Sequence, residues 1–198
     1  FKYMWERKKM FLCLFVGGSM VAILQYQSLW YPEHFMRSWD WTRAQAGQAT
    51  GLPTIFGGIS GLLLGGYYMS SQAKKGVKDI ALKLAFISAI GIAIPAVLMP
   101  LMSDTALAIG GVTIIKFFVA MPLIAGTTAI RMAVPNQMRG QFTAMYFVFV
   151  GLIGANLGPV MPGFINTYIF GEAAGTLGYA LAISAALTIP FSTILLWI

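Results

Sequence analysis

The sequence is poor in charged residues and has a single cysteine and a single histidine. Charged residues make up 10% of it, against about 25% in a typical soluble domain, so a soluble core with a charged shell is hard to build. Cys13 stands alone in an apolar run, which leaves no partner for a disulfide or a cysteine metal site and predicts a small buried side chain. His34 is expected in a solvated loop.

Long apolar stretches take the place of the missing charge. Apolar residues make up 58% of the chain, and the stretches are separated by short loops. About 20 apolar residues in helical form cross a bilayer, and backbone amides in lipid must bond within their own segment. The sequence therefore predicts an all-α membrane protein, a single bundle over 1–198 with six transmembrane helices at 10–31, 44–69, 80–101, 106–131, 140–165 and 177–197.

The formal charge of +7 is explained by topology, and no basic stripe suggests nucleic acid. Two basic residues, Arg37 and Arg43, fall on the side that also holds Glu33, Asp40, Asp104 and Glu172. By the positive-inside rule the other side, with both chain ends, is cytoplasmic, and anionic lipid headgroups add attraction there. The basic residues of that side are Lys2, Arg7, Lys8, Lys9, Lys74, Lys75, Lys78, Lys83, Arg131 and Arg139.

Proline and glycine indicate where the predicted spans end and where they pack closely. Pro32 is predicted to break the first helix, so that residues 32–43 form the one sizeable outer loop. Gly57, Gly61 and Gly65 recur every four residues in the second helix. Small residues at that spacing let two helix backbones approach closely, which favours a packed seam over the general abundance of glycine in membrane helices.

Lys116 is the residue that points most directly to function. It lies in the middle of the fourth span, where a charge costs a few kcal/mol and should face a wet cavity or a partner. Snorkelling to an interface is the alternative, though strained at this depth. Because no Asp or Glu lies deep in a span, the counter-charge is expected on an anionic substrate or on a segment outside this chain.

Five other polar residues are candidates for substrate contact. Gln25, Tyr26 and Asn156 are expected to contact substrate with Lys116, whereas hydrogen bonds between helices explain Thr50 and Thr113 equally well. Ser28 adds hydrogen-bonding capacity one turn beyond Gln25. The sequence indicates no catalytic residue, no metal site and no cofactor.

Two motifs carry a resemblance to a known family. The first is Val134-Pro135-Asn136-Gln137-Met138-Arg139-Gly140, followed downstream by Asn156-Leu157-Gly158-Pro159. The second is Trp30-Tyr31-Pro32, followed by Arg37, Gly47 and Gly51. Together they resemble the seventh-to-eleventh helix region of major facilitator superfamily transporters, in particular the spinster-like bacterial subgroup.

The resemblance implies the C-terminal six-helix half of a twelve-helix transporter, built from two inverted three-helix repeats. It implies that the first helix lines the cavity, that Gly57, Gly61 and Gly65 face a missing N-terminal half, and that Asn136, Arg139, Gly140, Gly158 and Pro159 belong to structural or gating motifs. The family's charged latch after the eighth helix is replaced here by Ser70 and Ser71. Since the chain begins with Phe1, we expect an excerpt of a longer protein.

The expected function is therefore secondary transport by alternating access in a bacterial inner membrane. The substrate would be a small amphipathic or anionic molecule, with lipid-like compounds first. A six-helix subunit that homodimerises, as a half-transporter or a channel-like protein, is the alternative. An intramembrane hydrolase is more remote: Gly58-Ile59-Ser60-Gly61 is similar to a rhomboid serine motif, but no span contains the histidine that would activate the hydroxyl.

Overall fold

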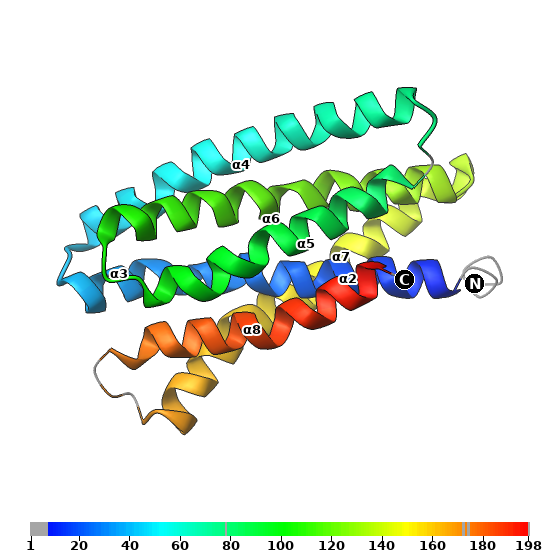
Figure 1. The fold of residues 1–198 in the computed structure, drawn as a ribbon. Helices are drawn as coiled ribbons and strands as arrows, with labels where there is room; N and C mark the ends of the chain where they lie inside the picture. Colours follow the sequence, from blue (N-terminus) through cyan, green and yellow to red (C-terminus); the bar gives the residue numbers. More distant parts are fainter. Residues whose placement is uncertain (1–7, 78, 172, 174, 198) are drawn as a thin grey trace.

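A computed structural model describes residues 8–77, 79–171, 173 and 175–197 (Figure 1). Lys2, Arg7, Lys78 and Glu172, which entered the charge prediction, lie outside these residues, as do the side chains of Lys8, Lys9 and Cys13. The described elements are α2 (Lys8–Gln27), η1 (Ser28–Trp30), α3 (Tyr31–Trp39), α4 (Arg43–Lys74), α5 (Ile80–Leu98), η2 (Met99–Leu101), α6 (Thr105–Ala133), η3 (Asn136–Met138), α7 (Arg139–Phe164), the π-helix η4 (Ile165–Ile169) and α8 (Thr176–Trp197).

The long helices form one bundle in which successive helices run in opposite directions, so that the start of α2 and the end of α8 lie at the same end (Figure 1). The described residues are helices and short connections, with no strand among them. The all-α prediction is therefore confirmed, and each predicted span corresponds to a helix whose limits differ from the prediction by a few residues.

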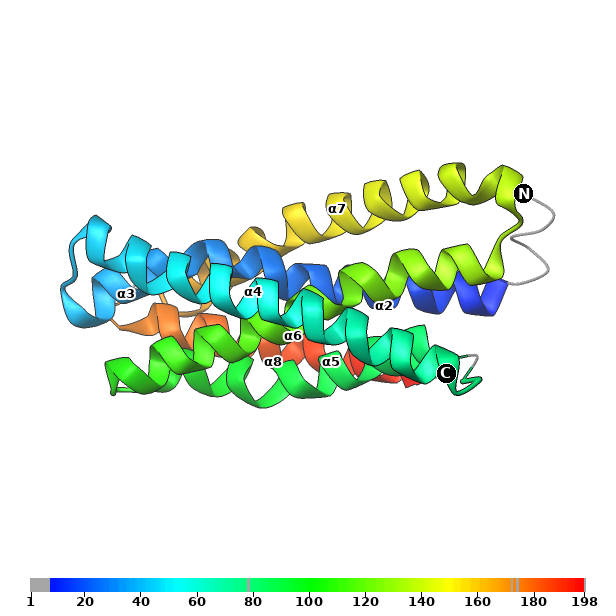
Figure 2. The same ribbon diagram turned by 90° about the horizontal axis from the view of Figure 1, so that it is seen from above.

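The long helices pack in an order that begins with α4 and ends with α7. The main contacts join α4 to α6, α6 to α5, α5 to α8, α8 to α2, and α2 to α7. Seen from above, α7 runs along one edge of the bundle (Figure 2). The largest core cluster includes Phe35, Ile92, Met99, Val112 and Leu181. It therefore lies between α3, α5, α6 and α8.

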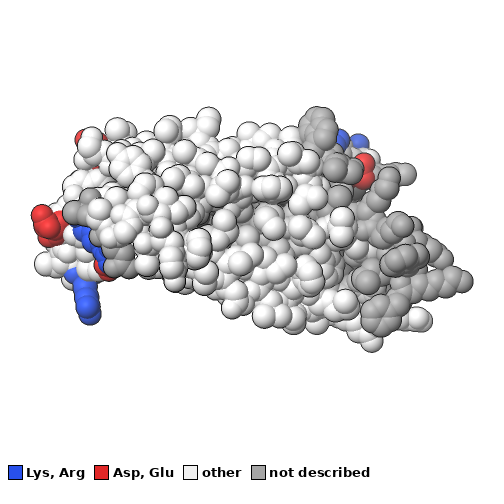
Figure 3. Space-filling model, turned by 90° about the horizontal axis from the view of Figure 1, so that it is seen from below, with Lys and Arg blue, Asp and Glu red and all other residues white. Residues whose placement is uncertain are grey.

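The surface carries the pattern of a membrane protein. Within the described residues, five helical segments are long and apolar enough to cross a membrane: Arg43–Lys74, Ile80–Leu101, Thr105–Ala133, Asn136–Ile169 and Thr176–Leu195. The remaining predicted span, the first at 10–31, corresponds to α2, which has 20 residues and is not among these five. Charged side chains gather near the two ends of the molecule, and a wide uncharged band separates them (Figure 3). These features are those of an integral multi-pass membrane protein. Which end of the bundle is cytoplasmic stays a prediction.

Local chemistry explains where the helices begin and end. Thr42 and Gln45 form a reciprocal capping box at the start of α4. The Asp104 carboxylate accepts a 2.9 Å hydrogen bond from the backbone amide of Leu107 and so caps α6. At the other end of α6, Val134 is extended in front of Pro135, as the sequence predicts, because proline disfavours helical geometry in the residue before it.

The prediction that Pro32 ends the first helix was wrong. Pro32 instead occupies the first turn of α3, so most of the predicted outer loop is helical and only residues 40–42 are not. Proline is tolerated there because its missing amide would have no partner within the helix anyway. The chain leaves α3 through Asp40, whose φ of 51° is left-handed.

The prediction that His34 is solvated was also wrong. Its side chain is 3% exposed and lies edge-on to the Trp39 ring, with a centroid distance of 5.7 Å. The Ser38 hydroxyl is 3.3 Å from Nδ1, and Nε2 has no hydrogen-bond partner among the described residues. Desolvation by this burial lowers the pKa of His34 to about 4, so the ring is neutral near pH 7.

The glycine seam is real, but it does not face a missing half. Gly57, Gly61 and Gly65 are buried against α6. A Cβ at Gly57 would lie 2.5 Å from the Thr113 carbonyl oxygen, and one at Gly61 would overlap the Phe117 carbonyl. The close approach of α4 and α6 uses up this face of α4. The side that α4 leaves open therefore carries bulky apolar residues instead.

Candidate functional site

Lys116 is joined to α2 by a hydrogen bond across the bundle. Its Nζ donates to the Ser28 hydroxyl oxygen at 2.7 Å, and that hydroxyl donates to the backbone carbonyl oxygen of Gln25 at 2.5 Å. The side chain of Lys116 is half-buried. The ammonium therefore points to another helix, as the sequence predicts for a group facing a partner, and it reaches the segment where α2 gives way to η1.

Helix α4 makes room for this lysine. A Cβ at Gly57 would come within 3.2 Å of the Lys116 Cβ, so the absence of a side chain on α4 allows the lysine stem to lie between α4 and α6. Within the described residues the one salt bridge joins Arg37 and Glu33, 2.6 Å apart at the end of the bundle. Lys116 therefore has a hydroxyl as its partner there, and no carboxylate.

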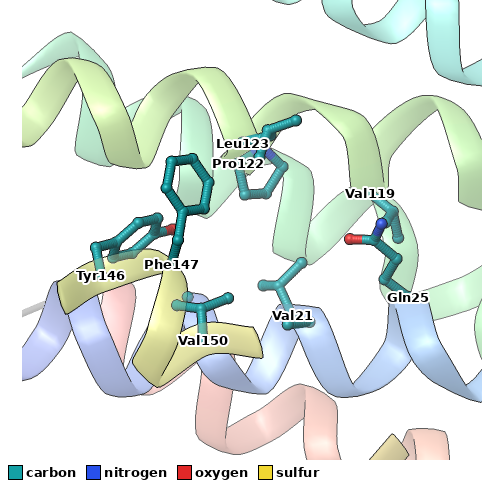
Figure 4. A pocket seen from close by; sticks show the side chains of 10 residues that line it. Val21, Gln25, Val119, Pro122, Leu123, Tyr146, Phe147 and Val150 are labelled. Carbon is teal, nitrogen blue, oxygen red and sulfur yellow. The ribbon is translucent and has the colours of Figure 1, made fainter. Parts of the chain in front are cut away.

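Gln25 lines a small cavity between α2, α6 and α7 (Figure 4). The cavity has a volume of about 50 Å³, whereas pockets for small molecules have volumes of roughly 300–1,000 Å³. Val21, Val119 and Pro122 make most of its wall apolar, and Tyr146 closes one side. This cavity therefore has room for water beside Gln25 but is too small for a substrate.

Tyr146 is part of this cavity and was missed by sequence reasoning. It is 3% exposed, and its hydroxyl lies 2.8 Å from where a Cβ on Gly18 would be, with Gly126 on the other side. The two glycines belong to α2 and α6, so the tyrosine ring from α7 fits between them. Since the three residues are far apart in the chain, no local pattern reveals the contact.

Tyr26, Gly158 and Pro159 meet where α2 packs on α7. A Cβ on Gly158 would lie 2.5 Å from the Tyr26 Cβ and 2.8 Å from the Ile23 carbonyl oxygen. The Trp30 indole donates a 2.8 Å hydrogen bond to the carbonyl oxygen of Pro159. Gly158 therefore permits close packing, and the ring of Tyr26 occupies the helix contact beside it.

The hydrogen bonds that link Lys116, Ser28 and Gln25, here called the Lys116 cluster, do not include three other predicted contacts, Thr50, Thr113 and Asn156. Thr50 and Thr113 each donate to the carbonyl four residues earlier, at 2.9 Å in both cases. The exposed Asn156 amide does the same toward Leu152, at 2.6 Å. A side chain that donates to a backbone carbonyl of its own helix satisfies its hydrogen-bonding group without a partner on another helix. Of the predicted substrate contacts, Lys116 is linked through Ser28 to the backbone carbonyl of Gln25, while the Gln25 side chain lines the small cavity.

The PNQMRG motif shapes the turn between α6 and α7. Arg139 Nε donates to the Val134 carbonyl oxygen at 3.0 Å, which ties the start of α7 to the end of α6. Asn136 lies in η3, and Asn136 and Gly140 are both exposed. In the serine motif of α4, the Ser60 hydroxyl donates to the Phe56 carbonyl at 2.6 Å.

Comparisons with known proteins add no relative. No protein-family model matches the chain, and no curated protein shows a significant match to it. The residues themselves and their placement in the bundle are therefore what points to function.

Proposed function

We propose that this chain is the C-terminal six-helix half of a secondary transporter of the major facilitator superfamily, within its spinster-like bacterial subgroup. The proposal is supported by the two sequence motifs and by a packing order in which α4 packs on α6 and α7 packs on α2. In the family these helices correspond to the eighth, tenth, eleventh and seventh. The protein would work by alternating access in the bacterial inner membrane, with both ends of the segment cytoplasmic.

The observation that carries the proposal is the hydrogen bond between Lys116 and Ser28. An ammonium has three protons to donate, and Ser28 accepts one of them. An anionic group beside Lys116 would neutralise its charge and accept further hydrogen bonds, which a neutral ligand could not match. A small amphipathic anion, lipid-like before sugar phosphates or organic acids, is therefore the substrate class we propose.

Binding at this site would act directly on α2. The Ser28 hydroxyl is held by Gln25 and accepts from Lys116, so an anion that attracts the ammonium competes for the same proton. Gln27, one residue before Ser28, donates a 2.7 Å hydrogen bond to the Leu181 carbonyl of α8. The junction of α2 and η1 is thus tied to α6 and α8, and a substrate that releases the first tie would change how α2 is held.

The test is uptake into proteoliposomes by the purified full protein. Lys116→Met should reduce uptake of an anionic amphipath such as lysophosphatidylglycerol at least tenfold, and Lys116→Arg, which keeps the charge, should retain part of it. Arg131→Met is the matched control, since it removes an exposed charge from the end of the same helix. Folding is checked by thermal shift. Normal uptake by a folded Lys116→Met protein would remove this lysine from the site.

The second candidate is a six-helix subunit that homodimerises as a half-transporter or a channel-like protein. It is favoured by the flanking helices, because α4 and α7 expose large apolar side chains such as Phe56, Leu63, Leu152 and Phe164 that a second copy could cover. The reading frame upstream of Phe1 discriminates between the candidates. Six further spans there would support the twelve-helix transporter, and a start site at this position would support the dimer.

A further inference from the structure

A groove runs between α4 and α5 on the outside of the bundle. Both helices pack mainly against α6 and contact one another little, so the space between them is floored by α6. The groove has a volume of about 320 Å³. Its lining is almost entirely apolar and consists of Leu64, Gly65, Tyr68, Leu84, Ile87 and Met121.

The groove leads toward a cluster of positive charge. Lys75, the residue directly after the end of α4, follows Tyr68 by seven residues, and Lys83 precedes Ile87 by four residues along α5. Residues at these spacings share a helix face, so both lysines continue the two walls of the groove toward the end of the bundle. Both side chains are exposed. Of the described residues that connect α4 to α5, Asp79 is the acidic one.

We propose that this groove is a binding site for one anionic phospholipid, with an acyl chain along the apolar lining and the phosphate held by Lys75 and Lys83. At about 1.5 Å per helical residue, Lys75 is roughly 10 Å from Tyr68 and Lys83 roughly 6 Å from Ile87 along the helix axes. The lysines therefore stand at headgroup level when the lining stands in hydrocarbon, and the Tyr68 ring suits the boundary between the two.

Charge complementarity identifies the occupant as a lipid of this kind. An apolar groove at membrane depth accepts a single acyl chain, and the basic residues at its end select a headgroup with net negative charge. The site belongs to the leaflet at the end of the bundle where α2 begins and α8 ends. Neither Lys75 nor Lys83 belongs to the Lys116 cluster, so this inference stands or falls independently of transport.

The experiment is native mass spectrometry of the purified protein, delipidated in detergent and titrated with phosphatidylglycerol. The unaltered protein should bind one phosphatidylglycerol in preference to phosphatidylcholine. The double variant Lys75→Gln, Lys83→Gln should bind it roughly twenty-fivefold more weakly, from about fivefold for each lysine. Soluble glycerol phosphate at the same concentration should not bind, because it lacks the chain that fills the groove.

Matched variants separate the site from general charge and from misfolding. Lys74→Gln removes one charge from the same end but from another face of α4, and should bind as the unaltered protein does. Ile87 is exposed and lines the groove, so Ile87→Trp should block it. Ile94 is exposed but lies outside the lining, so Ile94→Trp should leave binding unchanged. Equal binding by the double-lysine variant and Lys74→Gln, or unchanged binding by Ile87→Trp, would overturn the proposal, as would equal affinity for phosphatidylcholine.

Discussion

The indole nitrogen of Trp30 donates a 2.8 Å hydrogen bond to the carbonyl oxygen of Pro159, a residue 129 positions further along the chain. The same ring lies against Gly163, where an added Cβ would come within 3.2 Å of it. A backbone carbonyl has two lone pairs and can accept a side-chain hydrogen bond as well as a helical one, and this carbonyl lies in the part of α7 that holds both Pro159 and Pro162. Trp30 thus joins η1, which follows α2, to the proline-containing part of α7.

Replacing Trp30 by phenylalanine should weaken this contact. Trp30→Phe keeps most of the apolar contact and removes the indole donor, so we expect a loss of about 1 kcal/mol in stability. The midpoint of thermal unfolding in detergent measures it. Trp41→Phe is the control, because its ring stacks on Phe35 at 5.4 Å and a phenyl ring can still stack there. Equal loss in both variants would show that the hydrogen bond to Pro159 contributes nothing.

The glycines of α4 provide a matched pair of substitutions. Gly61→Ala places a methyl group against the Phe117 carbonyl and should destabilise the bundle by about 1–3 kcal/mol through overpacking. Gly58→Ala meets no atom within 4 Å and should be neutral or slightly stabilising, because alanine favours helix. Thermal shift compares the two directly. A stable Gly61→Ala protein would mean that α4 and α6 are further apart than the structure places them.

His34 should make stability depend on pH. Its pKa is lowered to about 4 by burial, against about 6.5 in an unfolded chain. As the pH falls below about 6.5, the unfolded chain binds a proton that the folded chain excludes until about pH 4, so stability is lost across this window, by up to about 1.4 kcal/mol per pH unit.

The measurement compares midpoints of thermal unfolding at pH 7 and pH 5 for the unaltered protein and for His34→Gln. The variant has no group that titrates at this position and should lose less stability on acidification. Identical losses would show that His34 is protonated as easily in the folded protein as in the unfolded one.

The contact between Lys116 and Ser28 can be measured by a double-mutant cycle. A hydrogen bond to a charged group contributes about 1.5–3 kcal/mol in favourable cases. For this half-buried pair, separated by 2.7 Å, we expect a coupling of about 1–2 kcal/mol between Ser28→Ala and Lys116→Met. Thermal unfolding of the four proteins gives the value. Strictly additive effects would mean that the ammonium does not bond Ser28.

Helix positions could be predicted closely because their signals are local. The signals that act through neighbouring residues are the long apolar runs, Pro135 after the fourth span, and the polar caps Thr42 and Asp104. The helices begin and end within a few residues of the predicted limits. Pro32 was misread because a proline that ends one helix and a proline that opens the next have the same local pattern. The helix that Pro32 opens is held by tertiary packing, because α3 contacts α4 and buries Tyr31, His34 and Phe35.

The candidate site was predictable only in part. The mid-span position of Lys116 indicated that its charge needs a partner, but its contact with Ser28 depends on how α2 and α6 are rotated about their axes. The rotation of α7 about its own axis turns Asn156 outward to bond its own helix and brings Tyr146 between two glycines of other helices.

The amino-acid sequence by itself determined that this protein is a helical membrane protein with charged ends and a lysine at mid-depth, because hydrophobicity and charge act residue by residue. Only the tertiary structure decided that the glycines of α4 face α6, that His34 is buried and that Lys116 reaches Ser28. Those outcomes depend on which helix faces are pressed together, and packing many side chains at once selects those faces.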